Sequence, residues 1–379
     1  MGKLKKAIVD LLIKKRIERT SKMMEKKLAH TNLDSNFQID SKVIEAHKQK
    51  WGRIFKGKIN LGWLQWYSKC TGITSPDFIP ESVFYTTVEP ILNDARYDMA
   101  FVEKNFYDLM YPDGIFPETI IRNIDELYFD RDYKALHLDN DQVLMDQLKG
   151  LDKIIIKPST ESGGGRDVEL YTLEDGKFMN RDGQQLTLQN MARLYKTNFL
   201  IQKILPQHSF PSFFNATSLN TVRVLTYRSD VTNTVNILQV VFRVGATGQF
   251  LDNSRAGGYS IGVDAATGKL NKFAFRKDGT RYEKVNEVNL AENEYTIPLF
   301  DEILSVAKLI AERNIHHRMH ALDMAIDHEN NIRCLEINNK GNEINFHQLN
   351  NGTLFGDFTD EVITYCEKHM DKLYRSYTV

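Results

Sequence analysis

The sequence predicts a mixed α/β protein in which a helix-rich N-terminal region precedes alternating strands and helices. Residues 3–31 are rich in Lys, Leu, Glu and Met and contain no Gly or Pro, which favours a helix. From about residue 100, short runs of β-branched residues alternate with helical stretches. The chain has 379 residues, and at about 150 residues per domain this length suggests two or three domains or lobes.

The composition is that of an ordinary soluble protein. Charged residues make up 26% of the chain and apolar residues 42%, and Pro is scarce, which argues against extensive disorder. The three cysteines are far apart and odd in number, so we expect neither a disulfide framework nor a cysteine-based zinc site. No apolar run is long enough to span a membrane, and no secretory signal is evident. We therefore expect a cytoplasmic protein.

The charge is concentrated at the N-terminus. Residues 1–30 carry ten Lys or Arg against three Asp or Glu, whereas the rest of the chain is slightly acidic. A basic nucleic-acid-binding protein is thus disfavoured. The basic helix could make peripheral contact with the inner face of the membrane or with a glycan-assembly partner; the alternative is a solvated or packed helix. Its apolar residues do not gather on one face, since Leu4 and Ile8 fall opposite Ile13 and Ile17.

Four regions follow from these patterns. We expect a basic N-terminal helix over 1–40, a helix-rich lead-in over 41–100, and mixed α/β parts over 101–200 and 201–379. Strands are predicted at 153–157, 168–172, 199–205, 221–227, 235–244, 321–327 and 332–338. Helices are predicted at 185–196, 300–314 and 359–374.

The strongest local signal is LDMAIDHENNIRCLEIN, two apolar strands around a polar turn. If Asp327 pairs with Ile332, stepping outward four residues each way places Asp323 opposite Glu336, with Asn338 on the same face as Glu336. Facing carboxylates repel one another unless a cation lies between them. Two carboxylates and an amide suit Mg²⁺ that arrives with substrate phosphates. We expect a metal site here; the alternative is an exposed hairpin face with ordinary surface charges.

A second signal is KPSTESGGGRDVEL, a strand followed by a Gly-rich turn. The main-chain N–H groups of Gly163, Gly164 and Gly165 can approach phosphate oxygens closely. Lys157 ends the preceding strand and could reach the α- and β-phosphates of a nucleotide. The alternative is a flexible hairpin, because neither a Walker A loop nor a GxGxxG fingerprint is present.

Two arginines, Arg223 and Arg243, lie within apolar strands. A long cation in such a place needs an anionic partner, which could be a phosphate, a substrate carboxylate or a structural ion pair. A Gly-rich loop at 251–260 suggests close approach to a ligand or movement. It includes the sequence GYSIG, but the strand-turn-helix context of a serine nucleophile is missing. The HHxxH sequence at 316–320 precedes a strand and is a weak zinc candidate.

Taken in order, these segments resemble the ATP-grasp superfamily, and most closely its sugar-transfer-associated branch. The resemblance runs from about residue 45 to residue 370. It rests on Glu103-Lys104-Asn105 and on KPSTESGGGR, IQKILPQ, SLNTVRV, DNSRAGG, LDMAID, LEINNKG and HQLNNGTLFGD. It implies the ATP-grasp fold, with two lobes of mixed or antiparallel sheet that clasp ATP.

The resemblance also implies roles for individual residues. Phosphates would be contacted by Lys104 and Lys157 and by a lid at Ser162, Gly163, Gly164 and Gly165. Adenine would meet Gln202, Lys203 and Leu205, although ATP-grasp proteins often have an acidic residue at this hinge. The metal ligands would be Asp323, Glu336 and Asn338, and Arg223 and Arg243 would stabilise the transferred phosphoryl group. Loops that shape the substrate pocket would include Asn220, Asp252, Asn253, Gly257 and Gly258.

The function implied is that of an ATP- and Mg²⁺-dependent ligase. A carboxylate would be phosphorylated to an acyl phosphate, and an amine would then displace the phosphate. The family name points to surface-polysaccharide or glycoconjugate assembly, with a small-molecule or sugar-linked substrate. Two alternatives remain open: a kinase that phosphorylates a sugar or polyol hydroxyl, and a nucleotide-binding scaffold without turnover.

Overall fold

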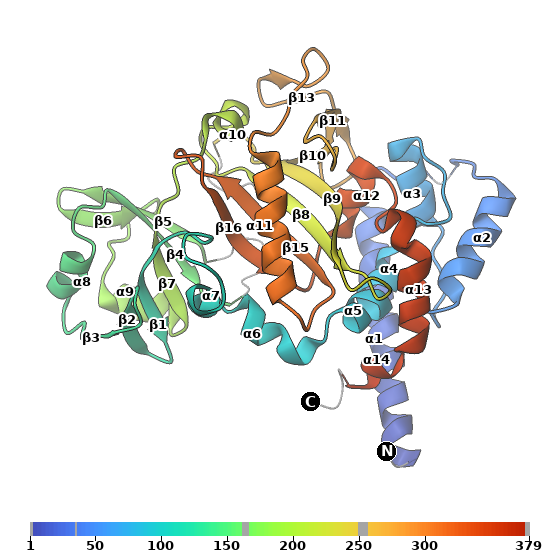
Figure 1. The fold of residues 1–379 in the computed structure, drawn as a ribbon, viewed down its shortest axis with the longest axis horizontal. Coiled ribbons are helices and arrows are strands. Elements are labelled where there is room, and N and C mark those ends of the chain that lie inside the picture. Colours follow the sequence, from blue (N-terminus) through green and yellow to red (C-terminus); the bar gives the residue numbers. More distant parts are fainter. Residues whose placement is uncertain (1–2, 35, 161–166, 249–256, 376–379) are drawn as a thin grey trace. The chain divides into compact units, whose positions relative to one another are not determined.

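The computed structural model, drawn in Figure 1, describes residues 3–34, 36–160, 167–248 and 257–375. The chain divides into two compact units. Unit 1 comprises Met1–Asp98, Ser209–Met324 and Asn338–Val379, and unit 2 comprises Met99–His208 and Ala325–Ile337. Each unit is therefore assembled from stretches that are far apart in the sequence.

Unit 2 is built on an antiparallel sheet with strand order β3-β2-β1-β7-β4-β5-β6. One face of this sheet packs against α8 and α9 around Ile154, Ile156 and Ile201 (Figure 1). The strands are β1 (Thr119–Ile124), β2 (Leu127–Asp130), β3 (Ala135–Leu136), β4 (Lys153–Pro158), β5 (Glu169–Glu174), β6 (Lys177–Asn180) and β7 (Phe199–Lys203). The helices are α6 (Asp98–Val102), η3 (Lys104–Phe106), α7 (Tyr107–Met110), α8 (Asp141–Gln147) and α9 (Leu188–Tyr195).

Unit 1 contains a second antiparallel sheet, with the order β12-β11-β10-β9-β8-β15. Helix α11 (Phe300–Arg313) lies across β8 and β9 (Figure 1). The strands are β8 (Thr221–Arg228), β9 (Val235–Val244), β10 (Tyr259–Val263), β11 (Leu270–Phe275), β12 (Arg281–Tyr282) and β15 (Met319–Ile326), with a separate hairpin of β13 (Lys284–Val285) and β14 (Val288–Asn289). Strand β16 (Ile332–Asn338) belongs to unit 2 except for its last residue.

The remaining helices of unit 1 come from both ends of the chain. The N-terminal ones are α1 (Lys3–Ala29), α2 (Ser41–Gly52), α3 (Gly62–Thr71), α4 (Glu81–Val83), the π-helical turn η1 (Phe84–Val88), α5 (Glu89–Leu92) and η2 (Ala95–Tyr97). The later ones are α10 (Ser209–Phe214), α12 (Ile344–Asn351), η5 (Gly356–Phe358), α13 (Thr359–Lys368) and α14 (Asp371–Arg375). The predicted fold class is thus confirmed, including the helix-rich N-terminal region.

All of the strands and helices predicted from the sequence are present, with ends shifted by a few residues. The helix predicted over 359–374 is divided into α13 and α14. Its first part carries a buried face of Val362, Ile363 and Cys366 that packs in the core of unit 1.

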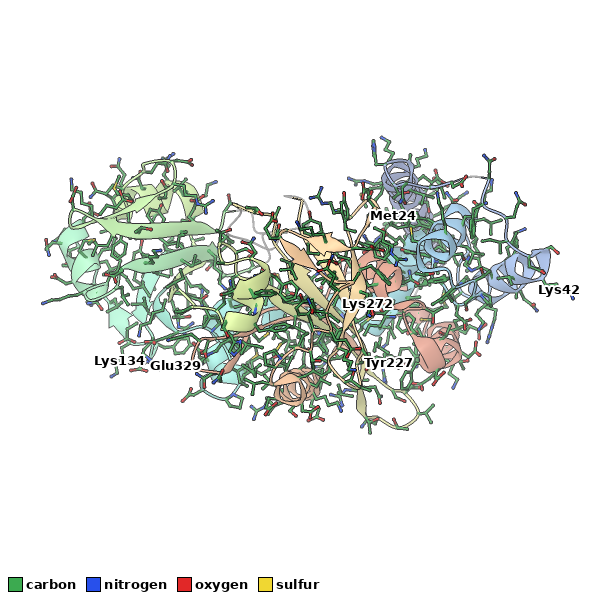
Figure 2. The ribbon with its side chains drawn as sticks, turned by 90° about the horizontal axis from the view of Figure 1, so that it is seen from above. Met24, Lys42, Lys134, Tyr227, Lys272 and Glu329 are labelled. Atoms are coloured by element: carbon green, nitrogen blue, oxygen red, sulfur yellow. The ribbon has the colours of Figure 1, made fainter. Side chains whose placement is uncertain are left out.

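Helix α1 is part of the core of unit 1. Met24, labelled in Figure 2, and Leu28 pack with the buried Trp63 and Trp66 of α3. Lys27 forms an ion pair of 2.6 Å with the fully buried Glu81. Removing residues 1–30 would therefore expose a large apolar surface and leave a buried carboxylate without its cation.

The helix has a second apolar face, opposite the packed one. Leu4, Ile8, Leu11 and Leu12 are between 43% and 76% exposed, whereas Val9 is buried. Their spacing of four, three and one residues places the exposed side chains on one side of a helix. Because the helix has two opposed apolar faces, its sequence does not show a single apolar face. None of the helices in the described part of the chain has the length and apolar content needed to cross a membrane.

Candidate active site

Two lysines and a carboxylate meet in unit 2. Lys104 Nζ lies 3.0 Å from Glu336 Oε1, and Lys104 is 7% exposed. Burial and the charge of Lys104 lower the pKa of Lys157 to about 7, although Glu336 partly offsets both effects. The Lys104–Glu336 ion pair and Lys157 therefore influence one another in a poorly solvated place. An additional anion at this point would be stabilised by both lysines.

The sheet and a main-chain hydrogen bond position the two lysines. Lys157 lies opposite Leu200 of β7, on the face of β4 that points away from the apolar core of Ile154 and Ile156. The Lys104 N–H donates to the Ser159 carbonyl at 2.8 Å, just after β4 ends. This bond fixes η3 beside the end of the strand and brings the two lysine side chains near one another.

A buried arginine secures η3 and α7 on the same face of the sheet. Arg122 lies beside Leu200 in the adjacent strand β1 and is fully buried. It forms an ion pair with Asp108 of α7, and its Nη1 donates to the Asn105 carbonyl at 3.4 Å. The Arg122–Asp108 pair was not recognised in the sequence, because the two residues meet only through the fold. The pair contributes to the site by holding η3, and with it Lys104, in position.

Strand β16 brings Glu336 to the lysines. The Cys334 N–H donates to the Ile115 carbonyl at 2.7 Å, and the Ile337 N–H donates to the Tyr107 hydroxyl at 3.3 Å. These two bonds bracket Glu336, whose side chain is 31% exposed. The carboxylate is thus fixed by its strand but remains accessible to a ligand.

The predicted adenine-binding residues lie on and beyond β7. Gln202 lies opposite Ile155, on the same sheet face as Lys157, and donates from Nε2 to the Pro117 carbonyl and the Thr119 hydroxyl, both at 3.1 Å. Lys203 is exposed and pairs with Glu118 at 2.6 Å. Leu205 follows the strand and is half-buried. Their contact with adenine stays a prediction.

A second cluster, in unit 1, joins three of the predicted residues. Arg223 forms a bidentate ion pair with Asp323, with Nε–Oδ1 and Nη2–Oδ2 distances of 2.7 and 2.8 Å. Arg243 Nη1 lies 3.3 Å from both carboxylate oxygens of Asp323. Arg223 Nη1 also donates to Glu343 at 2.8 Å. Burial works to raise the pKa of Asp323, but the two guanidinium groups outweigh it and lower that pKa to about 2. Glu343 was missed by the sequence analysis, because nothing local marks it as a partner of Arg223.

The predicted metal ligands have the donor chemistry that Mg²⁺ prefers. Asn338 Nδ2 donates to the Ala321 carbonyl at 3.2 Å and lies 3.5 Å from Asp323 Oδ2, which leaves the amide oxygen for a cation. Asp323 and Asn338 belong to unit 1, and Glu336 belongs to unit 2. Among the described residues, no three His, Cys, Asp or Glu side chains form a metal cluster. Amide and ligand oxygens would therefore complete any Mg²⁺ coordination.

The turn between β15 and β16 differs from the predicted one. The Asp327 N–H donates to the Asn331 carbonyl at 3.0 Å, so Asp327 does not pair with Ile332 as the register argument assumed. Asp327 Oδ1 accepts the N–H groups of Glu329 and Asn331 at 2.9 and 2.8 Å, and Asn330 is left-handed with φ 68°. The aspartate side chain thus tightens the turn by one residue. The premise that set Asp323 across from Glu336 is wrong, whereas the metal assignment itself stays a prediction.

A buried glutamate holds the loop that follows β16. Glu89 comes directly after the π-helical turn η1 and accepts the Gly341 N–H at 2.8 Å and Asn342 Nδ2 at 3.1 Å. Gly341 and Glu343 both have positive φ, 66° and 49°. The loop therefore needs this fixed acceptor to present Glu343 to Arg223. Burial raises the pKa of Glu89 to about 8.

Glu89→Gln is expected to remove a pH-dependent loss of stability. Because the folded pKa of Glu89 exceeds the ordinary value of 4.5, the native state retains a proton that the unfolded state releases, and stability falls as pH rises from about 4.5 to about 8. Gln keeps the acceptor oxygen without titrating. Thermal unfolding at pH 5 and pH 8 should show that the stability of Glu89→Gln relative to the wild type is greater at pH 8 than at pH 5. A difference that does not change with pH would contradict the assignment, and Glu89→Ala should be destabilised at both pH values.

The other predicted residues lie partly within and partly outside the residues that the structure describes. Asn220 is buried and donates to the Pro211 and Asn215 carbonyls, both at 2.8 Å, so its amide braces the loop before β8. Gly257, with φ 85°, and Gly258 lead into β10. Outside the described residues lie Ser162, Gly163, Gly164, Gly165, Asp252 and Asn253.

The two weak alternatives find structural explanations. Ser260 of the GYSIG sequence lies within β10; its hydroxyl donates to the Phe275 carbonyl at 3.1 Å and accepts from Asn350 at 2.9 Å. His317 contacts Asp98 at 2.9 Å, and His320 contacts Asn339 at 2.8 Å. A buried strand serine is no nucleophile elbow, and these histidines have protein partners.

Comparison with known families agrees with this arrangement. The family model described as sugar-transfer associated ATP-grasp matches residues 101–361, more than half of the chain. The chain belongs to this family. The match includes Lys104, Lys157, the two arginines and the three predicted metal ligands. No curated protein shows a significant sequence match.

Solved ATP-grasp structures are similar at a low level. The ATP-grasp ligase PsnB, complexed with a phosphomimetic variant of its minimal precursor, Mg and ADP, matches with 16% identity and a TM-score of 0.37, over 73% of this chain and 61% of PsnB. D-alanine-D-alanine ligase from Coxiella burnetii matches with 10% identity and a TM-score of 0.39, over 75% and 64%. The biotin carboxylase domain of Hydrogenobacter thermophilus 2-oxoglutarate carboxylase matches with 10% identity and a TM-score of 0.40, over 73% and 47%. The chain thus spans about three fifths of the length of PsnB.

Proposed function

We propose that this ATP-grasp protein is an ATP- and Mg²⁺-dependent ligase that activates a carboxylate as an acyl phosphate. The observation that carries the proposal is the ion pair between Lys104 and the accessible carboxylate of Glu336, beside the end of the strand that carries Lys157. Burial and, after it, the charge of Lys104 lower the pKa of Lys157, and a nucleotide phosphate chain would favour its charged form again. Gln202, on the same sheet face as Lys157, would contact the base.

The chemistry consists of two displacements. A carboxylate oxygen of the substrate attacks the γ-phosphorus of ATP, the bond to the β-phosphate oxygen breaks, and ADP leaves. An amine then attacks the acyl carbon, the carbon–oxygen bond to phosphate breaks, and inorganic phosphate leaves as the amine loses a proton. We assign to Arg223 and Arg243 the binding of the transferred phosphoryl group or of the carboxylate.

Bound Mg²⁺ would neutralise charge on the β- and γ-phosphates, and Asp323, Glu336 and Asn338 would hold it. Both oxygens of Asp323 already accept hydrogen bonds from Arg223, and the Arg243 contacts, at 3.3 Å, are the longer ones. A cation at Asp323 would therefore replace the Arg243 contacts more readily than the shorter Arg223 contacts.

Trapping with hydroxylamine tests the reaction class. The protein is incubated with Mg·ATP and a panel of carboxylates, including uronic acids and amino acids, and ADP release is measured. A ligase gives a hydroxamate when hydroxylamine replaces the amine, because hydroxylamine intercepts an acyl phosphate. ADP release with a stable phosphoester and no hydroxamate would establish the kinase alternative instead. Absence of turnover with the whole panel, together with tight nucleotide binding, would favour the scaffold alternative.

The family description points to a sugar-linked acceptor in polysaccharide or glycoconjugate assembly. The exposed face of α1, in addition, fits an anionic membrane surface. Leu4, Ile8, Leu11 and Leu12 form that face, and exposed Lys14, Lys15, Arg19 and Lys22 lie along the same helix. Apolar side chains flanked by cations are typical of helices that lie in the lipid interface. We propose that the protein makes peripheral contact with the membrane through this face.

The triple variant Ile8→Gln, Leu11→Gln, Leu12→Gln is expected to weaken binding to vesicles containing phosphatidylglycerol at least tenfold, since each apolar side chain contributes about 1 kcal/mol or more on burial. The matched control replaces by Gln three apolar residues elsewhere in the chain that are even more exposed, Leu109, Leu127 and Val231. Vesicle cosedimentation measures both. Equal binding by the two triple variants would contradict the proposal. Substitution is preferable to truncation, because α1 belongs to the core.

A further inference from the structure

A cationic cavity lies in unit 1, at the opposite end of the sheet from the Arg223–Asp323 cluster. It has a volume of about 330 Å³ and is lined in part by Arg228 and Arg318. Arg228 ends β8, and its N–H donates to the Arg318 carbonyl at 2.7 Å, just before β15 begins. At 3.3–3.4 Å per residue, the five-residue step from Arg223 to Arg228 corresponds to about 17 Å. The cavity is therefore a separate place from the predicted catalytic residues.

The walls of this cavity carry more positive than negative charge. Arg96, Arg228, Arg318 and Lys372 line it, and Asp94 is the acidic residue among its walls. Arg96 Nε donates to the two carboxylate oxygens of Asp94 at 2.9 and 3.1 Å. Arg318 pairs with Asp230 at 3.1 Å. Arg228 donates to the main-chain carbonyls of Ala311 and Glu312 at 3.1 and 3.0 Å. Among the described residues that line the cavity, four are cationic and one is acidic, and this excess of positive charge favours an anionic ligand.

Aromatic rings hold the cations in place. The Tyr365 ring lies 4.4 Å from the Arg318 guanidinium, and Lys372 Nζ donates to the Tyr365 hydroxyl at 2.5 Å. Tyr97 stacks on His316, with ring centroids 3.6 Å apart and an angle of 8° between the planes. Cation–π contacts orient side chains that would otherwise disperse into solvent. The stacked pair gives the cavity one flat wall beside the cationic ones.

We propose that this cavity binds a small organic oxyanion, a phosphorylated or carboxylated molecule of about the size of a sugar. Arginine recognises phosphate and carboxylate groups through paired N–H donors, and two arginines together with a lysine surround this space. A volume of about 330 Å³ lies at the lower end of the range of small-molecule sites. The proposal does not depend on the nucleotide site of unit 2.

Calorimetric titration of the full chain tests the proposal with glucose 6-phosphate, glucuronate and neutral glucose as probes. Binding of either anion at submillimolar concentration, with no binding of glucose, is the expected result. Phosphate or carboxylate preference then follows from which anion binds more tightly. Failure of both anions to bind at 10 mM, or equal binding of glucose, would overturn the proposal.

Matched variants locate the binding. Arg318→Gln and Arg96→Gln are each expected to weaken it about tenfold, and Arg53→Gln is expected to leave it unchanged. Arg96 and Arg53 each pair with one surface carboxylate, Asp94 and Glu367, but only Arg96 lines the cavity. Arg96→Gln also covers the case in which Arg318→Gln fails to fold. Loss of binding in Lys157→Met, or competition by ADP, would assign the anion to the nucleotide site and overturn the proposal.

Discussion

Arg223→Met is expected to lower the free energy of unfolding of unit 1 by about 3–5 kcal/mol, the cost of breaking a buried ion pair by removing one partner. Arg223 is 5% exposed and Asp323 is 6% exposed, and Arg223 also contacts Glu343. Without Arg223, the buried Asp323 and the half-buried Glu343 are left near a single arginine, Arg243. Only one of the two guanidinium groups that keep the pKa of Asp323 at about 2 then remains.

Urea unfolding followed by tryptophan fluorescence measures this effect, because all three tryptophans lie in unit 1. Arg53→Met is the matched control. Arg53 also makes a two-point contact with a carboxylate, Glu367, at 3.0 and 2.6 Å, but on the surface. A surface pair contributes at most about 1 kcal/mol. Equal losses of stability in the two variants would contradict the view that the Arg223–Asp323 pair organises this site.

Lys157→Met is expected to weaken Mg·ADP binding by about 10- to 100-fold, since hydrogen bonds to charged groups contribute about 1.5–3 kcal/mol. The same substitution should leave the ligand-free protein at least as stable as the wild type. Burial and Lys104 already disfavour the charged form of Lys157, so Met removes a cost of folding. Opposite effects on affinity and stability are typical of a residue kept for binding.

Lys153→Met is the control, because Lys153 lies on the same strand and the same face but is exposed. Calorimetric titration with Mg·ADP gives the affinities, and thermal unfolding without nucleotide gives the stabilities. Unchanged affinity in Lys157→Met would remove this lysine from the site. Loss of affinity in both variants would indicate a general charge effect instead of a specific contact.

Much of the fold could be predicted because its central strands are marked locally. The β-branched runs of β4, β8 and β9 and the apolar run of β15 predict strands, and Pro158 ends the first of them. Strands of two residues, such as β3 and β12, have too few residues to show a pattern. The π-helical turn η1 has no distinguishing sequence signal, because its residues suit an ordinary helix.

The candidate site was predictable only in part, for a related reason. Lys157 and Glu336 could be named from local motifs and Lys104 from the family resemblance, and all three belong to unit 2. The groups that position site residues meet only in the fold: Asp108 pairs with Arg122 under η3, and Glu89 holds the distant loop that carries Glu343. The register at the β15–β16 turn depends on hydrogen bonds of the Asp327 side chain. These bonds cannot be predicted by counting residues along the two strands.

Scanning calorimetry of the wild type and of Glu336→Gln, with and without Mg·ATP, tests the central claim most directly. At about 100 times its dissociation constant, a ligand stabilises the native state by about 2.7 kcal/mol. The account predicts a Mg²⁺-dependent rise in the unfolding temperature of the wild type that Glu336→Gln reduces. No shift at millimolar nucleotide, or an equal shift in both proteins and without Mg²⁺, would contradict a nucleotide site at Lys104, Lys157 and Glu336.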